Sequence, residues 1–196
     1  MIHRVLGLAL ASALFVATGA KAGELTAGVY GHDLGPASRE GGADFLVGWR
    51  SAPVDSLSLI WTPQVHVVAV ANTAVPTDWV AVGFDWKIGL QKLGLSSNFY
   101  LRPGIGMAYT TGKAGLPPVN APGLSPAEIS RRLHLYHTRK DFGSHWEFEP
   151  DLALGYRVSP KLAAELSYEH LSNGEILHHG KNQGLDDLGA RLIYAF

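Results

Sequence analysis

The residues with the clearest chemical capability lie near the end of the chain, in the segment Glu-Leu-Ser-Tyr-Glu-His-Leu-Ser-Asn at 165–173. Side chains two positions apart in a β-strand project from the same face. If this segment is a strand, His170 and Ser172 therefore lie side by side on an otherwise largely apolar face. A histidine within hydrogen-bonding reach of a serine is the minimum arrangement for a serine nucleophile that a general base activates.

Such a nucleophile needs a carboxylate that orients the histidine and stabilises its charged form. Asp186 is the first candidate, because it begins the next predicted strand and falls by parity on the apolar face with Leu188. Antiparallel neighbours joined by one loop would bring Asp186 towards His170. Glu175 and Asp187 remain alternatives for the acid, although parity directs Asp187 to the opposite face.

The two residues after Ser172 could stabilise the negatively charged oxygen that forms during acyl transfer. Asn173 and Gly174 are placed to donate hydrogen bonds to such an oxyanion. The same residue types are common turn formers, so both interpretations stay open.

Composition limits the classes of protein that this chain can be. Its 196 residues suit one domain, and 46% of them are hydrophobic. The chain has no cysteine, which excludes disulfides and thiolate metal sites or catalysis. The formal net charge is −1, and no basic run indicates a nucleic-acid partner.

The first 22 residues have the pattern of a secretory signal peptide. His3 and Arg4 precede an apolar run at 5–17, and Ala20-Lys21-Ala22 is a small-x-small cleavage signal. The mature protein is expected to begin at Gly23. The apolar run is too short to span a membrane as a helix.

In residues 23–196, apolar side chains alternate with small or charged ones. This alternation predicts strands at 24–32, 44–50, 57–69, 80–88, 99–109, 146–157, 162–172 and 188–196. Pro63 predicts a bulge or bend in the third strand. In the longest loop, 111–143, Ser125 followed by Pro126 and Glu128 predicts the N-terminus of a helix.

One face of most predicted strands is bulky and aromatic, and the other carries glycine and charge. The charged residues of the second face are Asp85, Lys87, Arg102, Glu147, Glu149, Asp151, Arg157, Glu165, Glu169 and Arg191. A polar interior and an apolar exterior are typical of outer-membrane barrels, whereas a soluble lipocalin-like barrel has these faces inverted. Export and a C-terminal aromatic residue favour the membrane barrel.

We therefore predict an all-β fold, an eight-stranded antiparallel transmembrane β-barrel of the bacterial outer membrane. Its interior is expected to be filled by ion-paired side chains, because eight strands leave little room for a channel. Short predicted turns at 51–56, 89–95 and 158–161 alternate with mostly longer loops, which places both termini on the periplasmic side.

Two motifs resemble those of a known family. His170-Leu171-Ser172-Asn173-Gly174 and Asn182-Gln183-Gly184-Leu185-Asp186 resemble the His-x-Ser-Asn and Asn-x-Gly-x-acid signature of the lipid A 3-O-deacylases (PagL). Pro103-Gly104-Ile105-Gly106, Phe142-Gly143-Ser144 and Phe148-Glu149 are similar to upstream segments of that family. The resemblance is strong over the C-terminal segment and weak over the rest of the mature chain.

The resemblance implies an outer-membrane esterase that hydrolyses the 3-O-acyl ester of lipid A in lipopolysaccharide. It implies a Ser172-His170-acid triad with no metal and no other cofactor. The acid of the family is usually glutamate, so Asp186 is one methylene shorter.

Other interpretations compete with this one. His134, His137, His178 and His179 could suggest a metal site, but they lie in predicted loops without nearby carboxylates. Arg131, Arg132, Arg139 and Lys140 could bind lipid A phosphates or form a solvated basic face.

A non-catalytic barrel whose external loops bind partners is the main alternative function. A barrel acyltransferase of the PagP kind needs an apolar interior, which the predicted inward charges oppose. The sequence leaves open whether the barrel forms a homodimer.

Overall fold

The computed structural model describes residues 22–74 and 77–196. The predicted signal peptide, apart from Ala22, lies outside the described residues. Within these ranges, no helix is long and apolar enough to cross a membrane.

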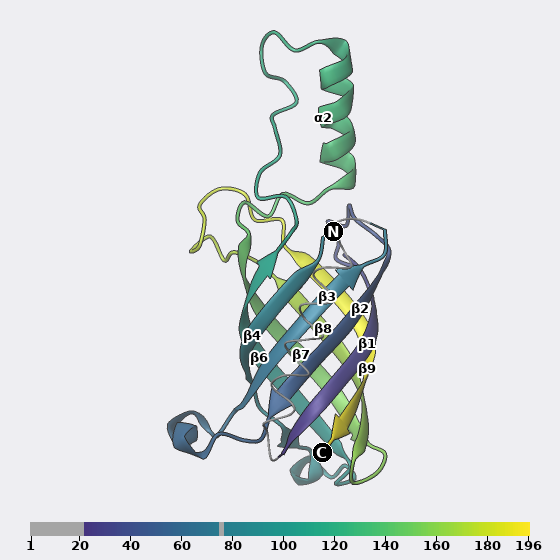
Figure 1. Ribbon diagram of the computed structural model, residues 1–196, viewed down its shortest axis with the longest axis vertical. Coiled ribbons are helices and arrows are strands. Elements are labelled where there is room, and N and C mark those ends of the chain that lie inside the picture. Colours follow the sequence, from purple (N-terminus) through teal and green to yellow (C-terminus); the bar gives the residue numbers. More distant parts are fainter. Residues whose placement is uncertain (1–21, 75–76) are drawn as a thin grey trace.

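The described residues form a closed antiparallel barrel (Figure 1). Its strands are β1 (Gly23–Gly31), β2 (Ala43–Ser51), β3 (Gln64–Asn72), β4 (Trp79–Asp85), β5 (Ile88–Gly89), β6 (Phe99–Thr110), β7 (Trp146–Arg157), β8 (Leu162–Leu171) and β9 (Leu185–Ala195). The helices are η1 (Asp55–Ile60), η2 (Gln91–Leu93) and α2 (Pro126–Thr138). Pairing of β1 with β9 closes the sheet, so it has no free edge.

The two short strands β4 and β5 occupy a single position in the wall. Both pair with β6, where Asp85 lies opposite Gly104 and Ile88 lies opposite Leu101. The wall therefore has eight strand positions, as the sequence predicts, and the predicted strand 80–88 is interrupted between Asp85 and Ile88.

The prediction of a strand from residue 57 is wrong. Residues 55–60 form the 3-10 helix η1, and β3 begins only at Gln64. Trp61 and Thr62 have left-handed backbone angles, with φ values of 63° and 47°, which a strand cannot contain. The connection between β2 and β3 thus spans 52–63 and is longer than the predicted short turn.

The predicted helix in the longest loop is confirmed. Helix α2 begins at Pro126, and its N-cap Ser125 accepts a hydrogen bond from the backbone N–H of Glu128 at 3.2 Å. Figure 1 shows α2 standing away from the barrel, at the end opposite the C-terminus. We call these two ends the long-loop end, with residues 32–42, 111–145 and 172–184, and the short-turn end.

Large apolar side chains cover the outside of the wall. They are exposed in every strand longer than two residues except β3; examples are Val29, Phe45, Val82, Ile105, Leu154, Leu166 and Leu192. The alternate positions point inward and are buried. This is the inverse of a soluble barrel and confirms the predicted distribution of polar and apolar faces.

Ion pairs fill the interior near the short-turn end, as predicted. Arg102 is fully buried and contacts Glu24 at 2.7 Å, Asp85 at 2.9 Å and Glu165 at 2.9 Å. Glu165 also pairs with Arg191 at 2.6 Å. The carboxylates and guanidinium groups neutralise one another, which is the condition under which charges are tolerated in a protein interior.

Replacing Arg102 with methionine is expected to destabilise the barrel by about 3–5 kcal/mol, because three buried carboxylates lose a shared cation. Unfolding by urea in phospholipid vesicles measures the change in the free energy of unfolding. The folded fraction is determined on gels from the heat-modifiable mobility of the barrel. Arg157→Met is the matched control, since Arg157 is exposed at the end of β7. Equal stability of the two variants would show that the buried network does not support the fold.

Candidate active site

His170 and Asp186 meet across two neighbouring strands at the long-loop end. They lie directly opposite each other in the β8–β9 register, and His170 Nδ1 is 2.7 Å from Asp186 Oδ1. Their side chains are 31% and 23% exposed, while their neighbours Leu171 and Asp187 are buried. The pair therefore lies on the outer wall of the barrel and remains accessible.

The hydroxyl of Tyr168 donates a hydrogen bond to the same oxygen, Asp186 Oδ1. Its ring is nearly parallel to that of His170, with centroids 6.5 Å apart and an interplanar angle of 17°. Tyr168 therefore fixes the carboxylate that orients His170. Sequence reasoning did not single out this residue, although its place two positions before His170 on the same face was the available signal.

Ser172 continues the ladder one residue beyond the end of β8. Its backbone forms two reciprocal hydrogen bonds with Phe148, of 2.7 and 3.1 Å. Leu171 and Asn173 on either side are buried, so Ser172 shares the outer face of His170. Among the described residues the Ser172 hydroxyl has no hydrogen-bond partner, and apo sites often tighten such contacts only with substrate.

Asn173 is fully buried, and its side chain organises the loop that follows Ser172. Its Nδ2 donates to the backbone carbonyls of Phe142 at 2.6 Å and Lys181 at 2.8 Å, and its Oδ1 accepts from the backbone of Glu175. Its backbone N–H donates to Asn182 Oδ1 at 3.1 Å. These contacts make Asn173 a structural residue of the site.

Gly174 lies at a left-handed position with a φ of 62°. Its backbone N–H forms no hydrogen bond within the part of the chain that the structure describes. Of the two predicted oxyanion donors, Gly174 therefore has the available N–H, whereas that of Asn173 is engaged.

The two alternative acids lie elsewhere. Asp187 points into the barrel, where it accepts a hydrogen bond from the backbone N–H of Asp33 at 3.0 Å. Glu175 is exposed in the loop after β8, and among the described residues its carboxylate contacts neither His170 nor Ser172. Of the three candidate acids, Asp186 alone contacts His170.

A model of the lipid A 3-O-deacylase (PagL) family matches residues 42–195. The chain belongs to this family. No curated protein sequence matches it significantly.

Solved structures of other transmembrane and outer-membrane proteins are similar to this chain. The crystal structure of the outer membrane enzyme PagL has a TM-score of 0.55 and 12% identity, over 87% of this chain and 98% of that chain. De novo designed transmembrane β-barrels give a TM-score of 0.48 and 14% identity, over 89% of this chain and 96% of theirs. The outer membrane protein Ail of Yersinia pestis has a TM-score of 0.45 and 12% identity, over 89% of this chain and 99% of that chain. This PagL-family chain is an outer-membrane β-barrel. The orientation with the long-loop end towards the cell exterior stays a prediction from loop length.

The first loop of this PagL-family barrel leaves space for the carboxylate of Asp186. The Leu34 backbone N–H donates to the Asp186 backbone carbonyl at 2.7 Å, which places Gly35 beside the side chain. A Cβ on Gly35 would lie 2.1 Å from Asp186 Oδ2. No sequence pattern pointed to Gly35, because the contact joins a loop to strand β9, which is distant in sequence.

Buried charges hold this loop over the barrel mouth. His32 Nδ1 is 2.8 Å from Asp44 and His32 Nε2 is 3.2 Å from Glu40. Burial disfavours a charge on His32, but its hydrogen bonds with Asp44 and Glu40 outweigh this effect and raise the pKa of His32 to about 10. Arg139 pairs with Glu40 at 2.7 Å, so the same cluster ties the first loop to the segment after α2.

The predicted basic residues divide into two groups. Lys140 pairs with Asp33 at 2.9 Å and is buried, as is Arg139, so both are structural. Arg131 and Arg132 both pair with Glu128 on α2, at 2.8 and 2.7 Å.

Among the residues that the structure describes, two groups have a spacing that could hold a cation, and both are buried. They are His32, Asp44 and Asp187, and His66, Glu149 and Asp151. Neither includes His170 or the loop histidines considered from the sequence.

Replacing Gly35 with alanine is expected to lower activity by about 10²-fold, because the new Cβ forces the Asp186 carboxylate away from His170. The fold should persist, since a carboxylate can rotate. Gly41→Ala in the same loop is the control, because a Cβ there meets no atom within 4 Å. The turnover rate and the free energy of unfolding are measured for both variants. Full activity in Gly35→Ala would show that the position of the Asp186 carboxylate is unimportant.

Proposed function

We propose that this chain is an esterase that hydrolyses the 3-O-acyl ester of lipid A through Ser172, His170 and Asp186 on the lipid-facing wall. The observation that carries the proposal is the 2.7 Å contact between His170 Nδ1 and Asp186 Oδ1, on the outer face shared with Ser172. Membership of a family of lipid A 3-O-deacylases supports the choice of substrate.

The contact assigns a separate task to each nitrogen of His170. Asp186 accepts a hydrogen bond from the Nδ1–H group, which fixes the tautomer and leaves Nε2 as the base. In the first step, Ser172 Oγ attacks the ester carbonyl and His170 Nε2 takes the hydroxyl proton. Asp186 stabilises the imidazolium that results.

The tetrahedral intermediate collapses when His170 gives its proton to the sugar oxygen, so the lipid A alcohol departs and an acyl-serine remains. His170 then takes a proton from water, whose oxygen attacks the acyl-serine. As this second intermediate collapses, His170 gives the proton to Ser172 Oγ and the fatty acid departs. The backbone N–H of Gly174 is our candidate for stabilising the oxyanion in both steps.

The location of the site supports a lipid substrate. A water-soluble ester has no reason to approach an apolar outer wall, whereas lipid A of the outer leaflet lies beside that wall. The buried charges around Arg102 and Arg191 leave the interior unsuited to an acyl chain, which disfavours an acyltransferase that binds its chain inside the barrel.

Mass spectrometry of lipid A from cells that express the chain tests the proposal. We expect a species that lacks the 3-position acyl chain, absent from cells with an empty vector. Unchanged lipid A, despite folded barrel in the outer membrane, would contradict the proposal and favour a non-catalytic barrel whose loops bind partners.

A further inference from the structure

A second feature lies on the outside of the barrel at the opposite, short-turn end. There, the connection between β2 and β3 stands away from the wall (Figure 1). Residues of this connection line a crevice of ≈ 440 Å³. Its lining includes Pro53, Trp61, Thr62, Trp86, Ile88 and Pro103. Gln64 and Lys87 complete the lining, so the crevice is mostly apolar.

The segment that forms the crevice is held in a defined position. The indole N–H of Trp86 donates to the Ile60 backbone carbonyl at 2.7 Å, and the Val54 N–H donates to the Pro63 carbonyl at 2.9 Å. Trp61 adopts a left-handed conformation that bulky residues rarely take. A conformation of this kind persists only when the surrounding structure imposes it.

This conformation exposes the largest apolar side chains of the segment. Leu59 is 94% exposed, Trp61 is 83% exposed and Ile60 is 41% exposed. Burying an apolar side chain of this size is worth about 1.5–3 kcal/mol, so a water-exposed position for all three is unfavourable. Tryptophan favours the membrane–water interface, where one side of its ring is apolar and the other is hydrated.

We propose that this crevice binds one acyl chain of a phospholipid from the inner leaflet, with η1 and Trp61 lying in the membrane interface. Loop length predicts that the short-turn end is periplasmic, and the leaflet beside that end is the phospholipid leaflet. A flexible apolar chain is the ligand that a mostly apolar crevice beside the outer wall can take from this leaflet. This inference rests on the membrane barrel and not on the esterase.

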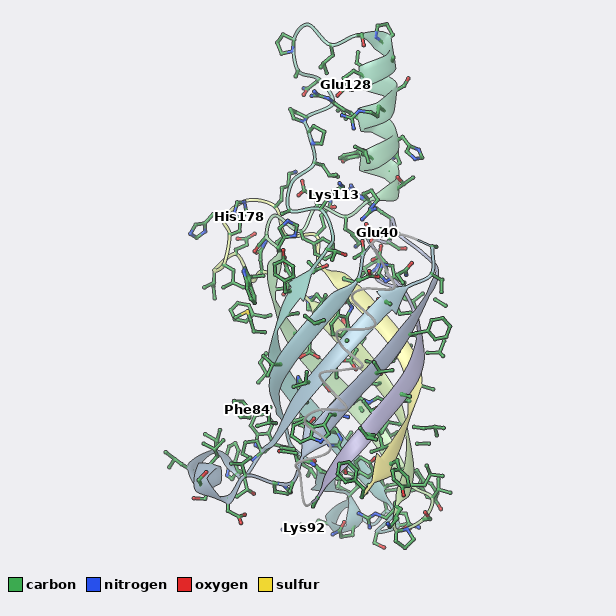
Figure 2. All side chains as sticks on the ribbon, in the orientation of Figure 1. Glu40, Phe84, Lys92, Lys113, Glu128 and His178 are labelled. Carbon is green, nitrogen blue, oxygen red and sulfur yellow. The ribbon has the colours of Figure 1, made fainter. Side chains whose placement is uncertain are left out.

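Because the chain has no cysteine, single cysteines can report the position of the segment. Leu59→Cys and Leu93→Cys would each carry a nitroxide in vesicles of phosphatidylethanolamine and phosphatidylglycerol. Leu93 is the control: it is 75% exposed in η2, another turn at the short-turn end, which lies below the barrel near Lys92 and not beside the outer wall (Figure 2). We expect the label at 59 to be more accessible to oxygen than to a water-soluble nickel complex, and the label at 93 to show the reverse. Equal preference for the nickel complex at both positions would overturn the proposal.

Filling the crevice tests the acyl chain itself. Ile88→Trp places a large side chain in the crevice, and Val82→Trp, on the wall outside it, is the control; the two native residues are 51% and 54% exposed. Phospholipid retained by each barrel after purification in detergent is measured by extraction and mass spectrometry. We expect a several-fold loss for Ile88→Trp only. Equal retention by both variants, or retention of detergent alone by the native barrel, would overturn the proposal.

Discussion

Replacing Ser172 with alanine is expected to lower deacylation by at least about three orders of magnitude, because no other group can form the acyl intermediate. The barrel should still fold, since the hydroxyl has no hydrogen-bond partner among the described residues and the Ser172 backbone bonds to Phe148 remain. Release of fatty acid from lipid A in mixed micelles measures the rate. Ser130→Ala, on the exposed surface of α2, is the control.

His170→Asn should cause a similar loss, and the double variant should be little worse than either single variant. Residues that act as one unit give strongly non-additive losses. If the losses from Ser172→Ala and His170→Asn multiply in the double variant, the two residues do not act together.

Asp186→Asn is expected to lower the rate by about 10⁴-fold, even though the side chains are nearly the same size. An asparagine amide can donate to Nδ1 of His170, which moves the ring proton to Nε2, where the base must be free. The barrel is expected to keep its stability, because Asp186 is half-buried and lies on the outer wall.

Glu175→Gln is the matched control for Asp186→Asn, because the Glu175 carboxylate is exposed away from His170. We expect the rate of this variant to equal that of the native chain. A large loss in Glu175→Gln, together with normal activity in Asp186→Asn, would assign the acid to the loop and not to β9.

The alternation of side chains was sufficient to predict the barrel. A period of two is a local property, so the outward and inward faces of β6 to β9 follow directly from the sequence. The same parity put Asp186 outside and Asp187 inside, where the structure has them. The Ser125 cap was likewise readable, because capping depends on three neighbouring residues.

Features that depend on contacts between distant loops could not be predicted. The space that Gly35 leaves for Asp186 arises because residues 32–42 fold back over β9. The 3-10 helix η1 was missed because Leu57, Leu59 and Trp61 imitate strand alternation, while the left-handed angles at Trp61 and Thr62 are invisible in the pattern.

Figure 2 shows the two ends of the barrel, at which the two proposed sites lie. Glu40 and His178 lie at the long-loop end, and Lys92 lies at the short-turn end. The proposed esterase site and the proposed phospholipid crevice therefore occupy opposite ends of the wall, so a variant in one leaves the other intact.

The account depends most on Ser172 being a nucleophile that His170 activates. Treatment of the folded barrel with a long-chain fluorophosphonate, followed by peptide mapping by mass spectrometry, tests this directly. We predict a phosphonate adduct on Ser172 in the native chain and its loss in His170→Asn. No adduct on Ser172, or equal labelling of both proteins, would contradict the account.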